Sequence, residues 1–378
     1  DARGRTLGEK ISSAPIIGNN LYTSLDLKSH QAAHKALNNR KGAVVAIDIK
    51  DGSIVTLFSS PTFPTNQLAN GILQKDFDEL LLSEEKPFFN RALKGRYPPA
   101  SAIKPAIAMY GIEEGLIDWN FSIFDEGFFT LPEDGRIYRD WKEGGHGNTN
   151  LFKAITQSSN TYFFDLAYRS DINQLNKHLL SLGFGDKACI DCFEEDKVFV
   201  PEPSWKMNKH NFGWFKGDTV NMGVGQGYLV STPVQLAKYA YIMANKGKFS
   251  DLSLKKDLVK SEKSIEFNKF SNDDWFKLHE SMINVIEGNT GTARRLREKK
   301  NYIVAAKTGT AELVSGDNRE QYSETRLDDN LRDHALIIAF GPMPNPRYAV
   351  SVVVENGESG GSVAGPVAIS VLNSLIQE

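Results

Sequence analysis

Apolar, β-branched runs near both ends of the chain predict the strands of one sheet. Residues 42–50 and 53–60 are two such runs, joined by Asp51-Gly52, and this arrangement is typical of a β-hairpin. Three more runs of the same kind stand late in the chain, at residues 302–313, 334–343 and 347–356. Since the five runs come from opposite ends of the sequence, they predict an antiparallel sheet that is interrupted by a long insertion.

Helical patterns occupy the ends and the middle of the chain. In residues 26–37, Asp26 can cap a helix with one apolar face, and residues 364–377 repeat apolar positions at i, i+3 and i+4. Residues 101–260 are mostly helices and loops in this interpretation, whereas residues 61–100, rich in proline and asparagine, are expected to be loop. The whole pattern predicts an α+β fold.

Composition and charge narrow the class of protein. The chain has 378 residues, of which 40% are hydrophobic and 24% charged, as in globular proteins of one large or two ordinary domains. Its net charge of −3, without a basic run that could follow a phosphate backbone, argues against nucleic-acid binding. No stretch of roughly 18 apolar residues is present to span a membrane. The chain begins at Asp1 without a methionine or a signal-like segment, which suggests a trimmed polypeptide.

The two cysteines, Cys189 and Cys192, form a C-x-x-C pair. A redox motif of this spacing is expected at a strand-to-helix junction of a thioredoxin-like unit, and the surrounding sequence lacks that pattern. A four-thiolate zinc site is excluded because the chain has no second pair. We therefore interpret the two cysteines as a structural pair or a local disulfide, and the sequence leaves their redox state open.

Three short motifs follow one another along the chain: Ser101-Ala-Ile-Lys104, Ser158-Ser-Asn160 and Lys307-Thr-Gly-Thr310. Each is common by itself, and the second alone would usually be a turn or capping signal. In this order they supply a nucleophile with a nearby base, a bridging polar pair and a cationic strand edge. That is the equipment for acyl transfer through a serine ester. Their wide spacing requires a large domain that folds around one cleft.

The first motif is expected near the first turn of a helix, because Pro98 and Pro99 precede it. Positions i and i+3 share a helix face, so Lys104 can reach the hydroxyl of Ser101. A lysine must lose its proton to act as a base. Burial close to a second cation, Lys307, would lower the pKa of Lys104 in the required direction.

The third motif ends an apolar run and is expected on a strand. Gly309 permits close approach of a ligand to the backbone. Thr308 and Thr310 offer hydroxyls to a substrate carboxylate, and the Thr310 amide is placed to form an oxyanion hole with the amide of the nucleophile. A rival nucleophile motif, Gly357-Glu-Ser-Gly-Gly361, needs a catalytic histidine downstream, but the last histidine is His334. We interpret that rival as a loop.

In longer strings, the chain resembles the penicillin-binding transpeptidases, and in particular the elongation-type class B group, penicillin-binding protein 2. The resemblance covers nearly the whole chain from about residue 20 and rests on the three motifs and four strings. The strings begin at Tyr97 (YPPASAIKP), Tyr138 (YRDWKEGGHG), Gly217 (GDTVNMGVGQGYLVSTPVQLAK) and Arg332 (RDHALIIAFGP). The string at Tyr138 is similar to the elongation group rather than to its septal counterpart.

The resemblance implies a serine β-lactamase/penicillin-binding transpeptidase fold: a five-stranded antiparallel sheet flanked by helices, an all-helical subdomain, and the cleft between them. It implies that residues 19–378 are the transpeptidase domain and that residues 1–18 end a preceding pedestal or linker. In the implied reaction, which cross-links peptidoglycan stem peptides during cell elongation, Ser101 attacks the penultimate D-Ala carbonyl of one stem and expels D-Ala. An amine of a neighbouring stem then resolves the acyl-enzyme. β-Lactam antibiotics would acylate the same serine.

By the same resemblance, Lys104 is the base of acylation, Ser158 and Lys307 relay protons, and Asn160 holds the substrate amide. The two threonines of the third motif would bind the terminal carboxylate or carbonyl of the substrate, and catalysis would require no cofactor. The alternatives on this fold are a β-lactam-hydrolysing enzyme and a β-lactam sensor. Hydrolysis would need a positioned water and a base, such as a glutamate near the nucleophile, which the sequence does not identify.

The resemblance also implies a location and partners. The membrane helix of the family, and most of the pedestal that engages the glycosyltransferase and the elongation-complex proteins, are expected to lie outside this chain. The domain would then stand at the periplasmic face of the inner membrane. A polar, charged loop at residues 315–330 follows the third motif, and the sequence does not predict its order.

Some members of the family bind structural zinc through two aspartates, a histidine and a cysteine in the middle of the second motif. Asp125, Asp140 and His146 match the first three ligands, but the fourth position is Ser159. A serine hydroxyl is a poor fourth ligand, because zinc prefers thiolate or imidazole in closed tetrahedral sites. The cluster is therefore expected to be either a zinc site or its vestige, a hydrogen-bonded clasp between loops.

Overall fold

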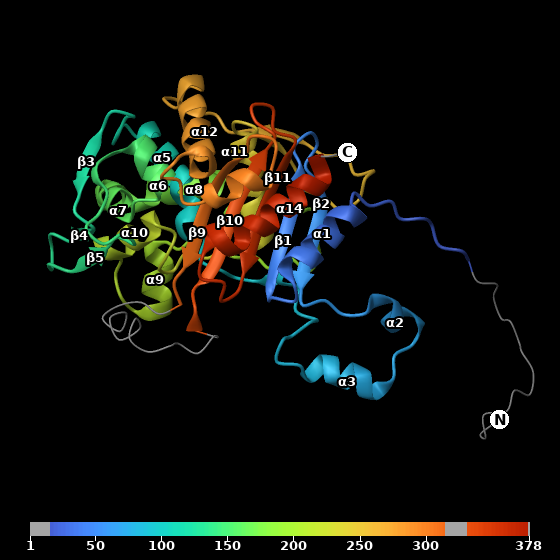
Figure 1. The fold of residues 1–378 in the computed structure, drawn as a ribbon. Helices are drawn as coiled ribbons and strands as arrows, with labels where there is room; N and C mark the ends of the chain where they lie inside the picture. Colours follow the sequence, from blue (N-terminus) through green and yellow to red (C-terminus); the bar gives the residue numbers. More distant parts are fainter. Residues whose placement is uncertain (1–15, 314–330, 377–378) are drawn as a thin grey trace, which may run out of the picture.

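One five-stranded antiparallel sheet stands at the centre of the molecule (Figure 1). The computed structural model describes residues 16–313 and 331–376. The strand order is β2-β1-β11-β10-β9, and every neighbouring pair is antiparallel. The strands are β1 (Gly42–Asp48), β2 (Ser53–Ser60), β9 (Ala305–Ala311), β10 (His334–Gly341) and β11 (Tyr348–Val354). All five predicted runs are confirmed, and strands from both ends of the chain meet in the sheet.

Helices cover both faces of the sheet because its strands are apolar on both sides. Alternate residues of a strand point to opposite faces, so Val44 and Ala46 pack under α1 and α14, whereas Val45 faces the core shared with α5 and α11. These helices are α1 (Leu27–Leu37), α5 (Lys104–Glu113), α11 (Pro233–Ala244) and α14 (Gly365–Ile376). The predicted first and last helices are confirmed, and Asp26 caps α1 by accepting from the Ser29 amide.

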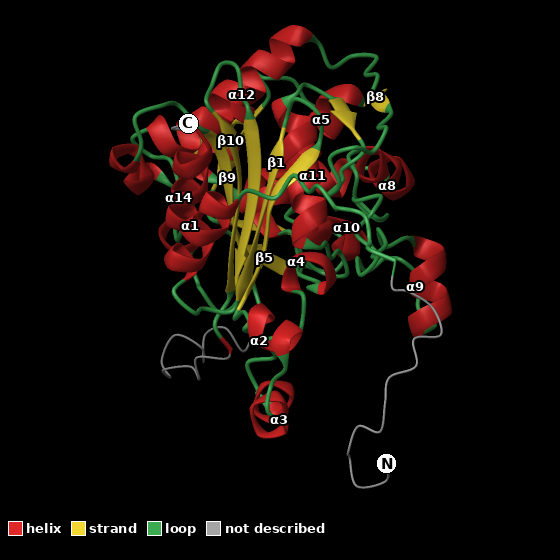
Figure 2. Ribbon diagram, turned by 90° about the vertical axis from the view of Figure 1, so that its right-hand side faces the viewer, coloured by secondary structure: helices red, strands yellow, loops and turns green. Residues whose placement is uncertain are grey.

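The insertion between the two halves of the sheet is mainly helical, as predicted, and lies beside the sheet (Figures 1 and 2). Its other helices are α6 (Leu151–Gln157), α7 (Asn160–Arg169), α8 (Ile172–Ser181), α9 (Pro203–His210), α10 (Lys216–Gly223) and α12 (Asn272–Glu287). Three strand pairs were not predicted: β3 (Ser122–Asp125) with β6 (Gly147–Asn150), β4 (Phe128–Thr130) with β5 (Ile137–Arg139), and β7 (Lys248–Ser250) with β8 (Glu262–Ser264). Such short strands have too few positions for alternation to reveal them.

The prediction of a loop over residues 61–100 is wrong in part. Three helices lie there: α2 (Thr65–Asn70), α3 (Gln74–Leu82) and α4 (Arg91–Lys94). Neither α2 nor α3 has a buried residue, and both project from one end of the sheet (Figures 1 and 2). α2 is only six residues long, and the prolines and asparagines around both helices dominated the pattern, although α3 carries the apolar residues Phe77, Leu80 and Leu81.

The cysteine pair has the structural role that its context predicted. Cys189 and Cys192 form a disulfide, which is buried in the long connection between α8 and α9. Across residues 16–313 and 331–376, no helix is long and apolar enough to cross a membrane. The polar loop predicted at residues 315–330 lies outside the described residues.

Candidate active site

The candidate nucleophile stands where a 3₁₀ turn runs into a long helix. Ala100–Ile103 form the turn η1, and α5 begins at Lys104, whose amide donates to the carbonyl of Ser101. Ser101 is partly exposed, whereas Lys104 is fully buried. The helix start predicted from the preceding prolines is therefore confirmed.

Oxygen atoms of the second motif surround the ammonium group of Lys104. Its Nζ donates to the carbonyls of Ser158 (2.7 Å) and Ser159 (3.0 Å) and to Oδ1 of Asn160 (2.7 Å). A longer hydrogen bond reaches Oγ of Ser158 (3.3 Å). The predicted hydrogen bond from Lys104 to the Ser101 hydroxyl is not among the contacts of the described residues. Catalytic hydrogen bonds often form only when substrate is in place, so this geometry leaves Lys104 a candidate base.

The third motif joins the other two from the edge strand β9. Lys307 is fully buried, and its Nζ donates to Oγ of Ser158 (2.8 Å), a residue 149 positions earlier in the chain. A second bond goes to the carbonyl of Thr308 (3.0 Å). The hydroxyl of Ser158 therefore lies between the ammonium groups of Lys104 and Lys307, and the predicted convergence of the three motifs is confirmed.

Both buried lysines are biased toward the neutral form. Burial lowers the pKa of Lys104 to about 7, against the opposing effect of the Asp140 and Asp125 carboxylates. Burial, followed by the nearby charge of Lys104, lowers the pKa of Lys307 well below its usual value. The predicted direction for the Lys104 pKa and the predicted effect of burial are confirmed, but the predicted contribution of Lys307 to it is not. Burial accounts for the lowered pKa of Lys104, and the repulsion between the two cations appears at Lys307 instead.

The backbone of the second motif is held in an uncommon conformation. Ser158 ends α6 with φ +61°, in the left-handed region, and its amide donates to the carbonyls of Ala154 and Ile155. Ser159 then caps α7, because its Oγ accepts from the amide of Tyr162 (3.2 Å). Non-glycine residues rarely adopt positive φ and persist there only when their surroundings hold them. Here the two helix ends hold Ser158 so that its hydroxyl faces both lysines.

Trp141 is a site neighbour that sequence reasoning missed. Its indole N–H donates to the carbonyls of Gln157 and Ser158, both at 3.2 Å. The ring is 56% exposed although it adjoins the buried second motif. Its place in the string that begins at Tyr138 was the only signal that the sequence offered.

Gly309 of the third motif allows a close approach of the backbone, and the predicted approach of a ligand there stays a prediction. A Cβ atom at this position would lie 3.2 Å from the Pro99 carbonyl oxygen and 3.3 Å from the Ala102 amide nitrogen. The group that comes close to the strand is therefore the nucleophile-bearing turn. Gly360, at the start of the π-helical turn η4 (Gly360–Ala364), lies against the other side, where its own Cβ would be 2.5 Å from the Gly309 oxygen.

The rival motif at residues 357–361 is a structural connection, as interpreted from the sequence. It links β11 to η4, and Oγ of Ser359 accepts from the amide of Ser362 (3.2 Å). Thr308 has a partner that the sequence did not suggest: its Oγ1 lies 2.6 Å from Oγ1 of Thr292. Since Thr292 precedes the turn η2 (Arg294–Lys299), no local pattern linked it to the site.

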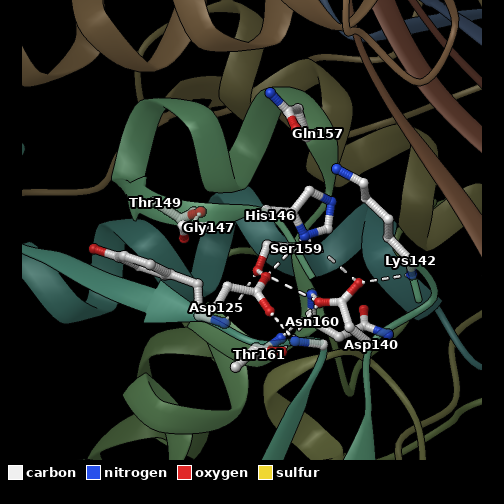
Figure 3. A network of polar contacts seen from close by, with 12 residues as sticks. Asp125, Asp140, Lys142, His146, Gly147, Thr149, Gln157, Ser159, Asn160 and Thr161 are labelled. Carbon is white, nitrogen blue, oxygen red and sulfur yellow. Dashed lines mark hydrogen bonds and ion pairs between the residues drawn. The ribbon is translucent and has the colours of Figure 1, made fainter. Parts of the chain in front are cut away.

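The predicted cluster of Asp125, Asp140 and His146 comes together beside the second motif (Figure 3). Their candidate ligand atoms lie within 4.8 Å of one another, and all three residues are buried. Oδ2 of Asp125 accepts from Oγ of Ser159 (2.7 Å) and contacts Nδ1 of His146 (2.8 Å). Burial by itself would raise the pKa of Asp125, but the hydrogen bonds from His146 and Ser159 outweigh it and hold that pKa well below its usual range.

Asp140 connects this cluster to the start of α7. Its Oδ2 accepts from the amides of Asn160 (2.6 Å) and Thr161 (2.9 Å). A carboxylate at a helix N-terminus satisfies free amide groups and complements the helix dipole. We call these four residues, Asp125, Asp140, His146 and Ser159, the clasp. The clasp orients the backbone of Asn160, whose side chain holds Lys104.

The clasp does not provide a complete donor set for structural zinc. A closed tetrahedral site requires four ligands, and here the fourth position is a neutral hydroxyl that donates a hydrogen bond to Asp125. The free ring nitrogen of His146, Nε2, is buried without a partner. Figure 3 shows that Nδ1, which already contacts Oδ2 of Asp125, is the ring nitrogen on the side of the carboxylates, whereas Nε2 lies on the other side of the ring. Of the two alternatives, the arrangement fits the hydrogen-bonded clasp.

Comparison with known proteins identifies the family of the chain. Residues 42–373 match the profile of a family described as the penicillin binding protein transpeptidase domain. The chain belongs to this transpeptidase family. The family resemblance stated from the motifs is thus confirmed, together with the fold, and acyl transfer in this family needs no cofactor.

Curated relatives place the chain within the family. It is 40% identical to the peptidoglycan D,D-transpeptidase MrdA of Acinetobacter baumannii, over 95% of this chain and 54% of that protein. It is 33% identical to MrdA of Escherichia coli, over 99% of this chain and 60% of that protein. The chain therefore spans between about half and three fifths of the length of these relatives.

Solved structures of the transpeptidase family have the same fold. A Pseudomonas aeruginosa PBP2 structure, in complex with WCK 5153, superposes with a TM-score of 0.87 at 35% identity, covering 96% of this chain and 80% of that one. PBP2 of Helicobacter pylori, in complex with MreC, also gives a TM-score of 0.87 at 30% identity, covering 100% of this chain and 68% of that one.

Proposed function

We propose that this transpeptidase domain is a peptidoglycan D,D-transpeptidase that cross-links stem peptides through an acyl-enzyme on Ser101. The observation that carries the proposal is the hydroxyl of Ser158 between two buried lysines, 3.3 Å from Nζ of Lys104 and 2.8 Å from Nζ of Lys307. Such a group can pass a proton between the nucleophile side and the leaving-group side of a cleft. The name of the MrdA relatives supports the same substrate class.

In the proposed acylation, neutral Lys104 accepts the hydroxyl proton of Ser101 as Oγ forms a bond to the penultimate D-Ala carbonyl carbon. The amide bond to the terminal D-Ala breaks, and its nitrogen takes a proton delivered through Ser158 and Lys307. An amine of a neighbouring stem then attacks the ester, releases Ser101 and completes the cross-link. β-Lactams would open their ring by the same attack and leave an acyl group on Ser101.

Substrate contacts in this proposal come from all three motifs. The amides of Ser101 and Thr310 would donate to the developing oxyanion, where preorganised donors contribute most to catalysis. The hydroxyls of Thr308 and Thr310 would hold the terminal carboxylate, and Asn160 the substrate amide. Gly309 would keep the strand close to the nucleophile turn, in line with its short distances to Pro99 and Ala102.

Labelling with a fluorescent penicillin tests this function. Wild-type protein should carry a covalent label that persists for many minutes, and Ser101→Ala should carry none. Ser359→Ala is the matched control, because Ser359 belongs to the rival motif and caps η4; this variant should label like wild type. Rapid loss of the label would instead indicate β-lactam hydrolysis, and no label on wild type would refute the proposal.

We further propose that residues 19–378 act as the catalytic domain of a longer protein that works in cell elongation at the periplasmic face of the inner membrane. Two similar structures, a PBP2–MreC complex and a peptidoglycan synthase complex, support partners of that kind. A glycosyltransferase and scaffold proteins would bind outside this chain. For the clasp, we propose a role without metal, in which hydrogen bonds from Ser159 and His146 do the work of an ion.

A further inference from the structure

We propose that the turn Gly225–Gln226, which follows α10, positions the two oxyanion donors, the amides of Ser101 and Thr310. The inference rests on the proposed acyl transfer at Ser101. It assigns a role to two residues outside the three motifs. Gly225 contacts the residue before Ser101, and Gln226 contacts the carbonyl of Thr310. We call this segment the positioning turn.

The first contact of the positioning turn is with the residue before the nucleophile. Ala100 is fully buried and has φ +48°, a left-handed conformation that is uncommon for alanine. Its amide donates to the carbonyl of Gly225 at 2.8 Å. Because Ala100 directly precedes Ser101, its backbone angles set the direction of the Ser101 amide. The hydrogen bond that Ala100 donates to Gly225 therefore holds both a strained residue and the amide of Ser101 that follows it.

The fit between the two backbones requires glycine at position 225. Gly225 is buried with φ +72°, and a Cβ atom there would lie 2.2 Å from the carbonyl oxygen and 2.7 Å from the nitrogen of Ala100. Those contacts are with backbone, which cannot turn aside as a side chain can. Any other residue at this position must therefore displace the Ala100 peptide and, with it, Ser101.

The second contact is with the strand that carries the other donor. Nε2 of Gln226 donates to the carbonyl of Thr310 at 3.2 Å. β9 is an edge strand, so one of its sides has no neighbouring strand, and the side chain of Gln226 reaches the Thr310 carbonyl there. The N–H and C=O of one strand residue project to the same side. By holding the carbonyl, Gln226 also fixes the direction of the Thr310 amide.

The positioning turn is itself anchored at both ends. The amides of Gly225 and Gln226 donate to the carbonyls of Met222 (2.9 Å) and Asn221 (3.0 Å) in α10. Farther along, Ser231 exchanges two backbone hydrogen bonds with Tyr97, at 2.8 and 2.9 Å. The turn is thus a fixed bridge between the nucleophile segment and the third motif. The separation of the two oxyanion donors depends on that bridge.

A pair of glycine substitutions isolates the effect. Gly225→Ala and Gly227→Ala impose the same backbone penalty, since the φ angles are +72° and +73°. At position 227, however, the nearest atom to a Cβ is the Asn221 side chain, at 3.2 Å. We expect Gly225→Ala to reduce the first-order acylation rate constant for penicillin by about 10- to 100-fold, because a displaced oxyanion donor should cost less than the roughly 10²- to 10³-fold lost when a donor is removed. Gly227→Ala should stay within about threefold of wild type under the same principle.

A transition-state analogue separates positioning from general damage. An acylaminomethyl boronic acid forms a tetrahedral adduct on serine and should lose affinity in Gly225→Ala in parallel with the acylation rate. The dissociation constant of the initial non-covalent penicillin complex should remain unchanged. Gln226→Leu leaves the backbone of the turn unchanged. It should also lower the acylation rate and the boronic acid affinity without changing the dissociation constant of the initial complex, but by a smaller factor. This variant tests the inference if Gly225→Ala does not fold.

Equal acylation rates in Gly225→Ala, Gly227→Ala and Gln226→Leu would overturn the inference. So would a loss that appears only as weaker initial binding. Either result would leave the proposed function intact, provided that wild-type protein is labelled at Ser101. Absence of that wild-type label would instead refute the proposed function itself.

Discussion

At the scale of single residues, the site depends on how two buried lysines share one hydroxyl. Lys104 and Lys307 both donate to Ser158, and burial favours the neutral form of each. Lys104 nevertheless keeps a pKa near 7 because the carboxylates of the clasp oppose the effect of burial. A lysine with a pKa close to neutral pH is partly unprotonated at that pH, and it is still basic enough to accept the proton of the nucleophile.

The rate of penicillin acylation should therefore depend on pH through Lys104. Its folded pKa of about 7 lies below the ordinary value of 10.5, and the reactive form is the neutral one. The second-order acylation rate constant should rise from about pH 6 and level off above about pH 8, as the neutral fraction approaches one. Stopped-flow fluorescence with a labelled penicillin measures it. Lys104→Arg should abolish acylation at every pH, and an inflection near 10 in wild type would contradict the assignment.

At the scale of elements, the clasp decides where α7 begins. Asp140 accepts from the first amides of α7, and Ser159 connects Asp125 to the same helix start. The clasp carboxylates come from β3 and from the loop after β5, elements that the sequence pattern did not predict. The four polar side chains of the clasp thus fix the start of α7, the helix that carries Asn160, by hydrogen bonds alone.

Metal analysis of Ser159→Cys tests the clasp. Wild-type protein should contain no stoichiometric zinc, and a chelator should leave its melting temperature unchanged. Ser159→Cys completes a donor set of one thiolate, one imidazole and two carboxylates, so it should bind about one zinc ion per chain and become chelator-sensitive. Ser281→Cys, at another fully buried serine, controls for the added thiol. Stoichiometric zinc in the wild-type protein would contradict a clasp that works without metal.

The disulfide should contribute only local stability. Cys189 and Cys192 close a loop of four residues, and Glu195 also holds that loop by accepting from the amides of Ala188 (2.7 Å) and Cys189 (2.9 Å). Replacing both cysteines by alanine should lower the free energy of unfolding by no more than about 2 kcal/mol, the chain-entropy value for so short a loop. Urea unfolding measures this loss, and penicillin labelling should persist. Loss of labelling in the folded variant would show a role beyond the loop.

At the scale of the whole molecule, distant parts of the chain must close one sheet. The end of β11 is tied to the segment before the nucleophile through Glu355, which accepts from Nε of Arg91 (2.9 Å) and from the hydroxyl of Tyr97 (2.7 Å). The Arg91 side chain is 3% exposed and that of Glu355 is 18% exposed. This largely buried ion pair, together with the Tyr97 hydrogen bond, links the end of β11 to the segment before Ser101.

Breaking that ion pair should destabilise the fold strongly. Arg91→Met leaves Glu355 buried without its cation and should cost about 3–5 kcal/mol in urea unfolding. Adding Glu355→Gln should recover part of the loss, because the unpaired charge is removed. Arg96→Met is the matched control: Arg96 pairs with Asp196 at the surface, and its loss should cost less than about 1 kcal/mol. Equal costs for the two arginines would contradict the importance of burial.

The sequence by itself determined the elements whose patterns are long and regular and the chemistry carried by motif order. The five strands, the first and last helices and the candidate residues Ser101, Lys104, Ser158 and Lys307 followed from apolar runs and residue types alone. The helices α2 and α3 and the short strand pairs did not, because they have no buried face or too few positions to leave a pattern.

Only the tertiary structure decided which groups meet. Three contacts join segments that are far apart in the chain: Gly309 with the nucleophile turn, Thr308 with Thr292, and Gly225 with Ala100. It also decided the role of Ser159, because its hydroxyl joins the clasp only where the carboxylates of Asp125 and Asp140 both lie within reach. The physical reason is that the residue type determines which hydrogen bonds and ion pairs a side chain can make. Distance and burial then decide which of them form and how strong they are.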